Sequence, residues 1–332
     1  LSQTYANVEV IVCDDESKDD SRAVIERCAQ QDARVKVLFN RHHGEVTTTN
    51  DAYEICRGEI ICLLDADDRF RSTKVEIIVR HFSEHPKSGL VVHPMTLINI
   101  AGQEIHTIPF TNQFEAGWIA ERVIHRGGRW RYMPTSGLSL RRELAESLLP
   151  VPETAKTSDG FIYTLAPLLT PVSFVPDVLA DYRLHDESLS MRGRGADQAR
   201  RAIAFRVAFV ETVNERLSAL GREAQWLDIR RNLEFLEQSL ASSLFVDVPR
   251  RGLLKEYTDF VRALVTDDLY RNPQKEARMV IYGIALLLPT KMRSMWLTMA
   301  LEPTRPKRHI RAFISRLMRQ QRGPKWRERV NG

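Results

Sequence analysis

Two clusters of carboxylates follow apolar, β-branched runs in the first part of the chain. Asp14 and Asp15 come after Val8–Cys13, and Asp65-Ala66-Asp67-Asp68 comes after Ile60–Leu64. Crowding like charges is unfavourable unless a cation compensates them. Two Asp residues spaced two apart just past a strand can reach one ion, and oxygen ligands suit Mg²⁺ or Mn²⁺, which typically bridge carboxylates to phosphates. The pattern indicates a metal and phosphate site at Asp65 and Asp67, with a solvated acidic turn as the alternative.

The sequence around these carboxylates predicts alternating strands and helices, which would bring the carboxylates together. The expected strands are Val8–Cys13, Val35–Phe39, Ile60–Leu64 and Leu90–His93, and the expected helices are Ser21–Gln31, Glu45–Cys56 and Ser72–Glu84. Such βα units predict an α/β fold with a mainly parallel sheet flanked by helices. The run Ile60–Leu64 does not alternate, as expected for a strand buried on both faces. Ligands of such sheets bind outside the carboxyl ends of the strands, where both acidic clusters fall.

The character of the chain changes further on. Short strands are expected at Leu138–Leu140, Val172–Val175 and Val178–Leu184. Beyond Ser190, apolar residues recur every three or four positions, which predicts amphipathic helices. We therefore expect an α/β domain over residues 1–190, a helical region over 191–302 and a basic tail over 303–332.

Composition narrows the class of protein. The 332 residues carry a net charge of +5, and ten Lys or Arg residues against one acidic residue lie beyond Pro303, so the basicity belongs to the tail. The four cysteines show no metal-ligand spacing and are expected to be reduced thiols, which fits the cytoplasm. We find no signal peptide and no uninterrupted apolar run of membrane-spanning length.

Five short motifs, in this order, resemble those of the inverting family 2 nucleotide-sugar glycosyltransferases. They are Asn7–Ser21, then Asn50 and Gly58 with Leu64–Asp68, Pro134–Gly137, Ser158–Gly160 and Tyr182–His185. Each motif alone is weak, but five in register over residues 1–190 are specific. The resemblance implies the GT-A fold and an enzyme of polysaccharide biosynthesis that uses a nucleoside-diphosphate sugar, most commonly a UDP-sugar, and a glycan or lipid-linked acceptor.

The resemblance also implies donor-binding residues. Asp14 or Asp15 would hydrogen-bond the nucleobase or ribose, and Asp65 would hold the ribose or phosphate side. Asn50 would belong to the same substrate-binding set, and so would Gly137, whose motif Pro134–Gly137 resembles the family's acceptor-side loop.

On the metal and acceptor sides, the implied residues are again carboxylates and one histidine. Asp67 would bind Mg²⁺ or Mn²⁺, with Asp68 as an alternative ligand and His185 approaching from the far side. Asp159 would take a proton from the acceptor hydroxyl, which is a poor nucleophile without a base.

The carboxylates also have ordinary structural explanations. Asp14 and Asp15 could cap the helix expected at Ser21–Gln31, and Asp159 could be the N-cap of a helix over Phe161–Leu168.

The other candidates have such explanations too. His185 could be a partly buried histidine and Gly137 a turn glycine. Trp118, Trp130 and Tyr132 could stack on an acceptor sugar or belong to the core.

Some features depart from the family pattern. The family's first strand would precede Leu1, so the chain is expected to lack it and to be a fragment or a processed product. Two other functions therefore stay open: an inactive sugar- or nucleotide-binding module, and a phosphatase with a DxD nucleophile. The phosphatase pattern wants Thr or Val at position 69, where Arg69 stands.

The tail has its own pattern. Ile310, Phe313, Ile314, Leu317 and Met318 form one helical stripe among arginines. This pattern predicts a peripheral anchor, formed by residues 303–332, on the anionic inner face of a membrane. The alternative is packing on the protein's own helices. No nucleic-acid partner is expected, because the tail offers few aromatic residues for base stacking.

Overall fold

The computed structural model describes residues 1–40, 44–108, 114–131, 134–184, 196–245, 248–290, 292–293 and 296–297. The chain divides into two compact units, Leu1–Leu236 and Glu237–Gly332, and each is described by itself.

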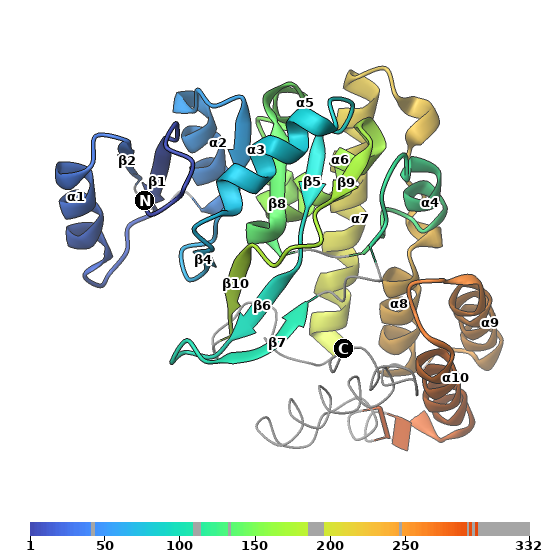
Figure 1. Cartoon of the computed structure of the whole chain (residues 1–332). Helices are drawn as coiled ribbons and strands as arrows, with labels where there is room; N and C mark the ends of the chain where they lie inside the picture. The colour runs from blue at the N-terminus through green and yellow to red at the C-terminus, as the bar shows by residue number, and fades with distance from the viewer. Residues whose placement is uncertain are drawn as a thin grey trace, which may run out of the picture. The chain divides into compact units, whose positions relative to one another are not determined.

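The first unit alternates strands and helices and then becomes less regular (Figure 1). Its elements are β1 (Val10–Asp14), α1 (Ser21–Gln31), β2 (Val35–Phe39), α2 (Glu45–Ile55), β3 (Ile60–Cys62), β4 (Arg69–Phe70), α3 (Lys74–Glu84), β5 (Leu90–Val92), β6 (Met95–Ile98), β7 (Glu104–Ile108), α4 (Ala120–His125), β8 (Leu138–Arg141), α5 (Arg142–Leu148), α6 (Ser158–Leu169), β9 (Val172–Phe174), β10 (Ala180–Arg183) and α7 (Ala196–Ala219). The α/β class and the strands expected from the sequence are confirmed, with ends shifted by a few residues. The hairpin β6–β7 was not predicted.

The strands form three sheets with mixed directions. Strands β1 and β2 pair in parallel, and a four-stranded sheet has the order β3-β8-β5-β9. In that sheet β8 runs antiparallel to both β3 and β5, so the expectation of a mainly parallel sheet is corrected. Among the described residues β3 pairs only with β8 and is an edge strand, which explains why it is half-buried and why Leu64 beyond it is 48% exposed.

The third sheet brings distant segments to the acidic turn. Its order is β4-β10-β6-β7, with β10 parallel to β6 and antiparallel to β4. Strand β4 directly follows Asp65–Asp68, so its pairing with β10 sets the last residues of the α/β domain beside that turn.

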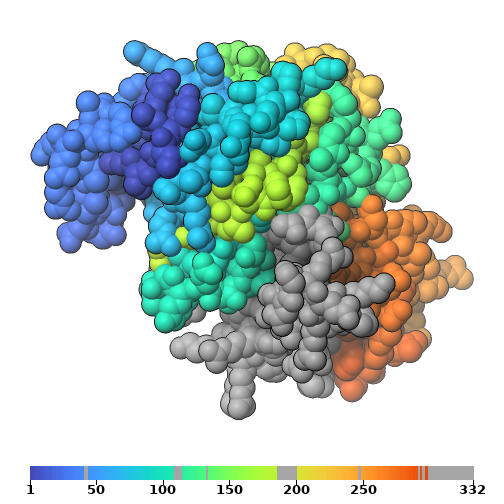
Figure 2. All heavy atoms as spheres, in the orientation of Figure 1, coloured from blue at the N-terminus to red at the C-terminus, as the bar shows by residue number. Residues whose placement is uncertain are grey.

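One helix lies at the centre of the core. Phe161, Ile162 and Leu165 of α6 are almost completely buried, in one cluster with Val213 and Leu217 of α7. Because α7 shares this core, the first unit extends past residue 190, where the sequence suggested a boundary. Figure 2 shows α1, β1 and β2 as a blue lobe beside the cyan residues of α3.

The second unit is helical where it is described. Helix α8 (Leu233–Phe245) leads into it, followed by α9 (Arg250–Thr266) and α10 (Asn272–Leu287). The rings of Phe260 and Tyr282 meet edge to face, and Glu237 accepts hydrogen bonds from Arg278 and Tyr282. The helical character predicted beyond Ser190 is confirmed for the described residues. The tail 303–332 lies outside the described residues. None of the helices described here is both long and apolar enough to cross a bilayer.

Candidate active site

The acidic turn after β3, Asp65–Asp68, is hydrogen-bonded to the loop before β8. The backbone N–H of Asp65 donates to Ser136 Oγ at 3.0 Å, and the N–H of Asp68 donates to the carbonyl of Asp65 at 3.1 Å. Ser136 itself is fully buried in a short 3₁₀ turn, Thr135–Gly137. The backbone of the turn is thus fixed to a buried residue 71 positions further along the chain.

The carboxylates of this turn and of α6 act on one another. Burial raises the pKa of Asp65 to about 7, and the negative charges of Asp68, Asp159 and Asp67 add to the effect. Burial also raises the pKa of Tyr182, and the same four carboxylates contribute. The geometry that brings the two segments together is in neighbouring residues of one loop, because Ser136 accepts the N–H of Asp65 and Thr135 donates to Asp159.

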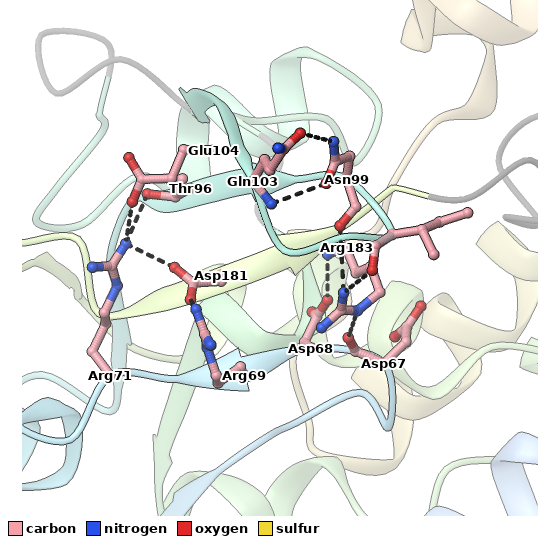
Figure 3. A network of polar contacts seen from close by, with 11 residues as sticks. Asp67, Asp68, Arg69, Arg71, Thr96, Asn99, Gln103, Glu104, Asp181 and Arg183 are labelled. Carbon is pink, nitrogen blue, oxygen red and sulfur yellow. Dashed lines mark hydrogen bonds and ion pairs between the residues drawn. The ribbon is translucent and has the colours of Figure 1, made fainter.

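Arg183 fastens the turn to the β6–β7 hairpin (Figure 3). Its backbone N–H donates to Asp68 Oδ1 at 2.9 Å, and its Nε donates to the Asp67 carbonyl at 2.9 Å. Its Nη1 donates to the carbonyls of Asn99 at 3.3 Å and Ile100 at 3.0 Å. One guanidinium therefore joins the acidic turn to the loop between two strands.

Ion pairs around one buried carboxylate hold Arg69 of β4 and the nearby Arg71 (Figure 3). The side chain of Asp181 on β10 is 1% exposed and contacts Arg69 Nη2 at 2.6 Å and Arg71 Nη2 at 2.8 Å. Arg71 also reaches Glu104 and Thr96. Burying a carboxylate without a partner is costly, so these arginines allow Asp181 to stay inside and hold β4 on β10.

A lysine lies under the same turn. Lys74 is fully buried, donates from Nζ to the Ser136 carbonyl at 2.8 Å and lies 3.6 Å from the centre of the Phe70 ring. Burial lowers its pKa to about 8. Lys74 thus fixes Ser136, the residue whose hydroxyl accepts the N–H of Asp65.

Asp159 lies in the first turn of α6, with a second carboxylate beside it. Its Oδ2 accepts a long hydrogen bond from Thr135 at 3.4 Å. Glu45 of α2 accepts the N–H of Ser158 at 2.9 Å and so occupies the start of α6. Burial raises the pKa of Glu45, and the charge of Asp159 contributes. The N-cap of α6 is Thr157, so Asp159 is not the N-cap.

Strand β1 ends at Asp14, and Asp15 follows directly after it. Asp14 is buried and accepts the N–H of Ser17 at 3.2 Å, and Asp15 accepts the N–H of Gly44 at 2.9 Å. Helix α1 has Asp20 as its N-cap, so the alternative that Asp14 and Asp15 cap this helix is wrong.

Other predicted residues have different surroundings. Asn50 exchanges hydrogen bonds with both backbone groups of Val151, at 2.9 and 2.8 Å, and so ties α2 to the segment after α5. Gly137 is buried in the turn below Asp65. Trp130 is 4% exposed, whereas Trp118 is 65% exposed. His185 and Tyr132 lie outside the described residues.

The turn offers oxygen atoms suited to a divalent cation. Oδ2 of Asp68 is buried without a hydrogen-bond partner, which is the state expected of an atom that awaits a ligand. The described residues contain no group of three His, Cys, Asp or Glu side chains able to hold a metal by themselves. Magnesium is commonly held by one or two carboxylates together with substrate phosphates, so Asp67 and Asp68 fit that pattern.

Several residues at the site were missed in the sequence. Ser136 and Arg183 lay in recognised motifs, but their contacts to the backbone of the turn have no sequence signal. The sequence contains no signal that Glu45 and Lys74 belong to the site, because a Glu or Lys in a helix is usually exposed to water.

Comparison with known proteins identifies the class of enzyme. Residues 1–149 match the family model described as glycosyl transferase family 2. An uncharacterized glycosyltransferase of Nostoc sp. is 28% identical over 240 residues, 71% of this chain and 74% of that protein. The UDP-Glc:alpha-D-GlcNAc-diphosphoundecaprenol beta-1,3-glucosyltransferase WfaP of Escherichia coli is 39% identical over 88 residues, 26% of this chain and 34% of that protein's length.

A solved structure shows the same fold. Staphylococcus aureus TarS 1-349, in complex with UDP-GlcNAc, superposes with a TM-score of 0.51 and 16% identity, covering 90% of this chain and 84% of that one. The fold is therefore of the GT-A type. The match of residues 1–149 to the family 2 model, together with the glycosyltransferase relatives, shows that the protein is a glycosyltransferase. The family match decides against the phosphatase alternative.

Proposed function

We propose that the protein transfers a sugar from a nucleoside-diphosphate donor to an acceptor hydroxyl with inversion at the anomeric carbon. The observation that carries this proposal is that one buried loop holds both carboxylate segments: Ser136 accepts the N–H of Asp65 in the acidic turn, and Thr135 donates to Asp159 of α6. The TarS structure with UDP-GlcNAc supports a uridine-diphosphate sugar as donor. WfaP, named for a lipid-diphosphate acceptor, supports a lipid-linked glycan as acceptor.

In this proposal Asp159 is the general base. It takes the acceptor proton while the acceptor oxygen bonds to the anomeric carbon, and the nucleoside diphosphate leaves with the electron pair of the broken carbon–oxygen bond. Attack opposite to the leaving group inverts the anomeric centre. Glu45 and Thr135 position Asp159 through the first turn of α6 and the loop before β8.

The other carboxylates bind the donor in this proposal. Asp65 lies on the ribose or phosphate side, and Asp14 or Asp15 on the side of the nucleobase. Asp67 and Asp68 would hold Mg²⁺ or Mn²⁺, which offsets negative charge on the diphosphate. The hydrogen bonds of Asn50 to Val151 favour a structural role for its side chain instead.

Replacing the base tests the proposal. Asp159→Asn should lower the rate of sugar transfer by about 10²-fold, the usual scale for losing acid–base assistance. The donor affinity should stay the same, because the base faces the acceptor. Near-normal turnover in this variant would show that the base lies elsewhere.

Removal of the cation tests the donor site. Calorimetry with UDP should show binding that depends on Mn²⁺ and is lost in EDTA. Asp67→Asn should weaken this binding several-fold, since one of two carboxylate ligands becomes a neutral amide. Equal UDP affinity with and without EDTA would contradict the metal assignment.

We also propose that residues 303–332 bind the cytoplasmic face of a membrane, on the pattern of the sequence alone. Sedimentation with anionic vesicles should show binding that falls with salt and disappears on truncation before Pro303. Equal binding by the truncated chain would reject the anchor.

A further inference from the structure

A cavity of about 250 Å³ lies in the first unit, between the loop after α4, helices α6 and α7, and the segment before α8. Two glycines form its base because backbones approach closely there. Gly127 has a φ of +59°, and a Cβ at this position would lie 2.5 Å from the backbone nitrogen of Asn232. A Cβ on Gly128 would lie 2.9 Å from Leu227. The cavity is therefore built by close packing of specific residues.

The cavity lies about one helical turn along α6 from the proposed base, which does not itself line it. Tyr163 lines it and stands four residues after Asp159 on α6, so both side chains share one face of the helix, about 6 Å apart along its axis. Phe209 also lines it, and its ring lies 3.8 Å from the position a Cβ of Gly160 would take. A molecule in this cavity would lie about one turn of α6 from Asp159.

Rigid aromatic side chains form one wall. Trp130 and Tyr163 stack with ring centres 4.7 Å apart. The indole Nε1 of Trp130 donates to the Tyr163 carbonyl at 2.9 Å, and the Tyr163 hydroxyl donates to the Trp130 carbonyl at 2.6 Å. These paired hydrogen bonds hold the rings in place, so the wall is preorganised for a ligand.

Charged groups of both signs lie opposite this wall. Glu234 contacts Arg129 at 3.5 Å and also pairs with Arg206. Planar carboxylate and guanidinium groups hydrogen-bond well to neighbouring hydroxyls, and aromatic surfaces pack on C–H groups. A phosphate would meet the Glu234 carboxylate, which makes an anion a poorer fit than a neutral sugar.

A second, more open hollow adjoins the cavity and shares Val210, Leu227 and Ile229 with it. It exposes Trp226, which is 51% exposed and fixed by a hydrogen bond from Nε1 to Ser218 Oγ at 3.0 Å. An exposed, anchored indole offers a flat apolar face on which a sugar ring can stack.

We propose that the cavity and the adjoining hollow bind an acceptor glycan of at least two pyranose rings, one in the cavity and the next on Trp226. This inference rests on the proposed function, because it takes Asp159 as the base that the acceptor hydroxyl must reach. It names the acceptor class as a carbohydrate chain held by Arg129, Arg206, Glu234 and Trp226.

Saturation-transfer NMR and calorimetry with the full chain test this inference. The probes are methyl glucoside, methyl N-acetylglucosaminide, cellobiose, chitobiose and inorganic phosphate. At least one disaccharide should bind more tightly than its methyl glycoside. Glu234→Gln and Trp226→Ala should each raise the dissociation constant of that disaccharide by about five-fold or more, the scale of one lost hydrogen bond or stacking contact.

Two matched variants serve as controls. Phe39→Ala removes an aromatic ring of β2 that is 37% exposed and does not line the cavity, and Glu121→Gln removes an exposed carboxylate of α4. Both should leave disaccharide binding unchanged, and circular dichroism should show that all four variants are folded. Failure of every sugar to bind, equal loss in control and cavity variants, or binding of inorganic phosphate in competition with the disaccharide would each overturn the inference.

A separate measurement distinguishes failure of the proposed function. Calorimetry of UDP binding by the unaltered chain, with Mn²⁺ and without sugar, reports the donor site alone. UDP binding without sugar binding in the cavity would reject only the acceptor site. Sugar binding that depends on Glu234 and Trp226, without any UDP binding, would leave the glycan site standing and reject the proposed donor site.

Discussion

Replacing Arg183 should disturb the reaction more than the fold. Its guanidinium donates hydrogen bonds to three backbone carbonyls, those of Asp67, Asn99 and Ile100. These hydrogen bonds of the guanidinium go to backbone oxygens and not to carboxylates of the acidic turn. Arg183→Ala frees the carbonyl of Asp67 and leaves only the backbone hydrogen bond from residue 183 to Asp68. The turn can then move away from the β6–β7 hairpin.

The size of the effect follows from these contacts. Each hydrogen bond contributes about 0.5–1.5 kcal/mol net, and water can reach the freed carbonyls of the exposed residues Asp67 and Ile100. The free energy of unfolding should therefore fall by only about 1–3 kcal/mol. A displacement of reacting groups by about 1 Å can cost about 10²-fold, so kcat/KM for the donor should fall by about 10- to 100-fold.

Steady-state kinetics with a varied donor concentration separate positioning from folding. Loss of positioning raises the donor KM, because Asp67 and Asp68 lie on the diphosphate side, whereas loss of folded enzyme lowers kcat at constant KM. Arg183→Lys keeps the charge and should recover only part of the activity, since an ammonium cannot span the three carbonyls. Arg22→Ala removes an exposed arginine of α1 that pairs with Glu26 and lies over the Phe39 ring, and it is the control. A donor KM unchanged in Arg183→Ala would refute the reasoning.

Three further predictions concern residues around the site. Asn50→Ala should lower the free energy of unfolding by about 1–3 kcal/mol, because two backbone groups of Val151 lose their partners, and calorimetry should show unchanged UDP affinity; a large loss of UDP affinity in a folded variant would restore a donor role. Phe161→Ala should cost about 3–5 kcal/mol in urea unfolding, since the ring is completely buried, and a cost below 1 kcal/mol would contradict the described core. Burial lowers the pKa of Lys74 to about 8, below that of the unfolded chain, so the unfolded state binds more protons between pH 8 and pH 10.5 and stability should rise with pH in this window. Urea unfolding of the parent chain and of Lys74→Met should show that rise, up to about 3 kcal/mol, only in the parent; identical pH profiles would refute it.

The local elements were largely accessible from the sequence. Helix α1 and strand β2 begin and end where periodicity and β-branched residues predict. The carboxylates of the acidic turn were also visible, because charges after an apolar strand are conspicuous. The direction of β8 was not, since a four-residue strand reads the same whether it pairs in parallel or antiparallel.

The contacts that hold the site were inaccessible for a different reason. Ser136 supports Asp65 across 71 positions, and Arg183 reaches Asp67 across 116. No periodicity spans such separations. Lys74 shows the same limit, since its helix is amphipathic whether the lysine is buried or exposed, and only packing under the turn places its ammonium on Ser136.

The sequence by itself determined the residue types: apolar strands that must be buried, carboxylates at their ends, and an Asp in the first turn of a helix. These follow from local preferences and from the cost of leaving apolar surface in water. Only the tertiary structure decided which of these groups meet. Asp65 and Asp159 come from elements nearly a hundred residues apart, and their proximity depends on β10 pairing with β4 and on α6 packing in the core. The free energy of that packing, spread over many buried side chains, outweighs the repulsion between the carboxylates that it brings together.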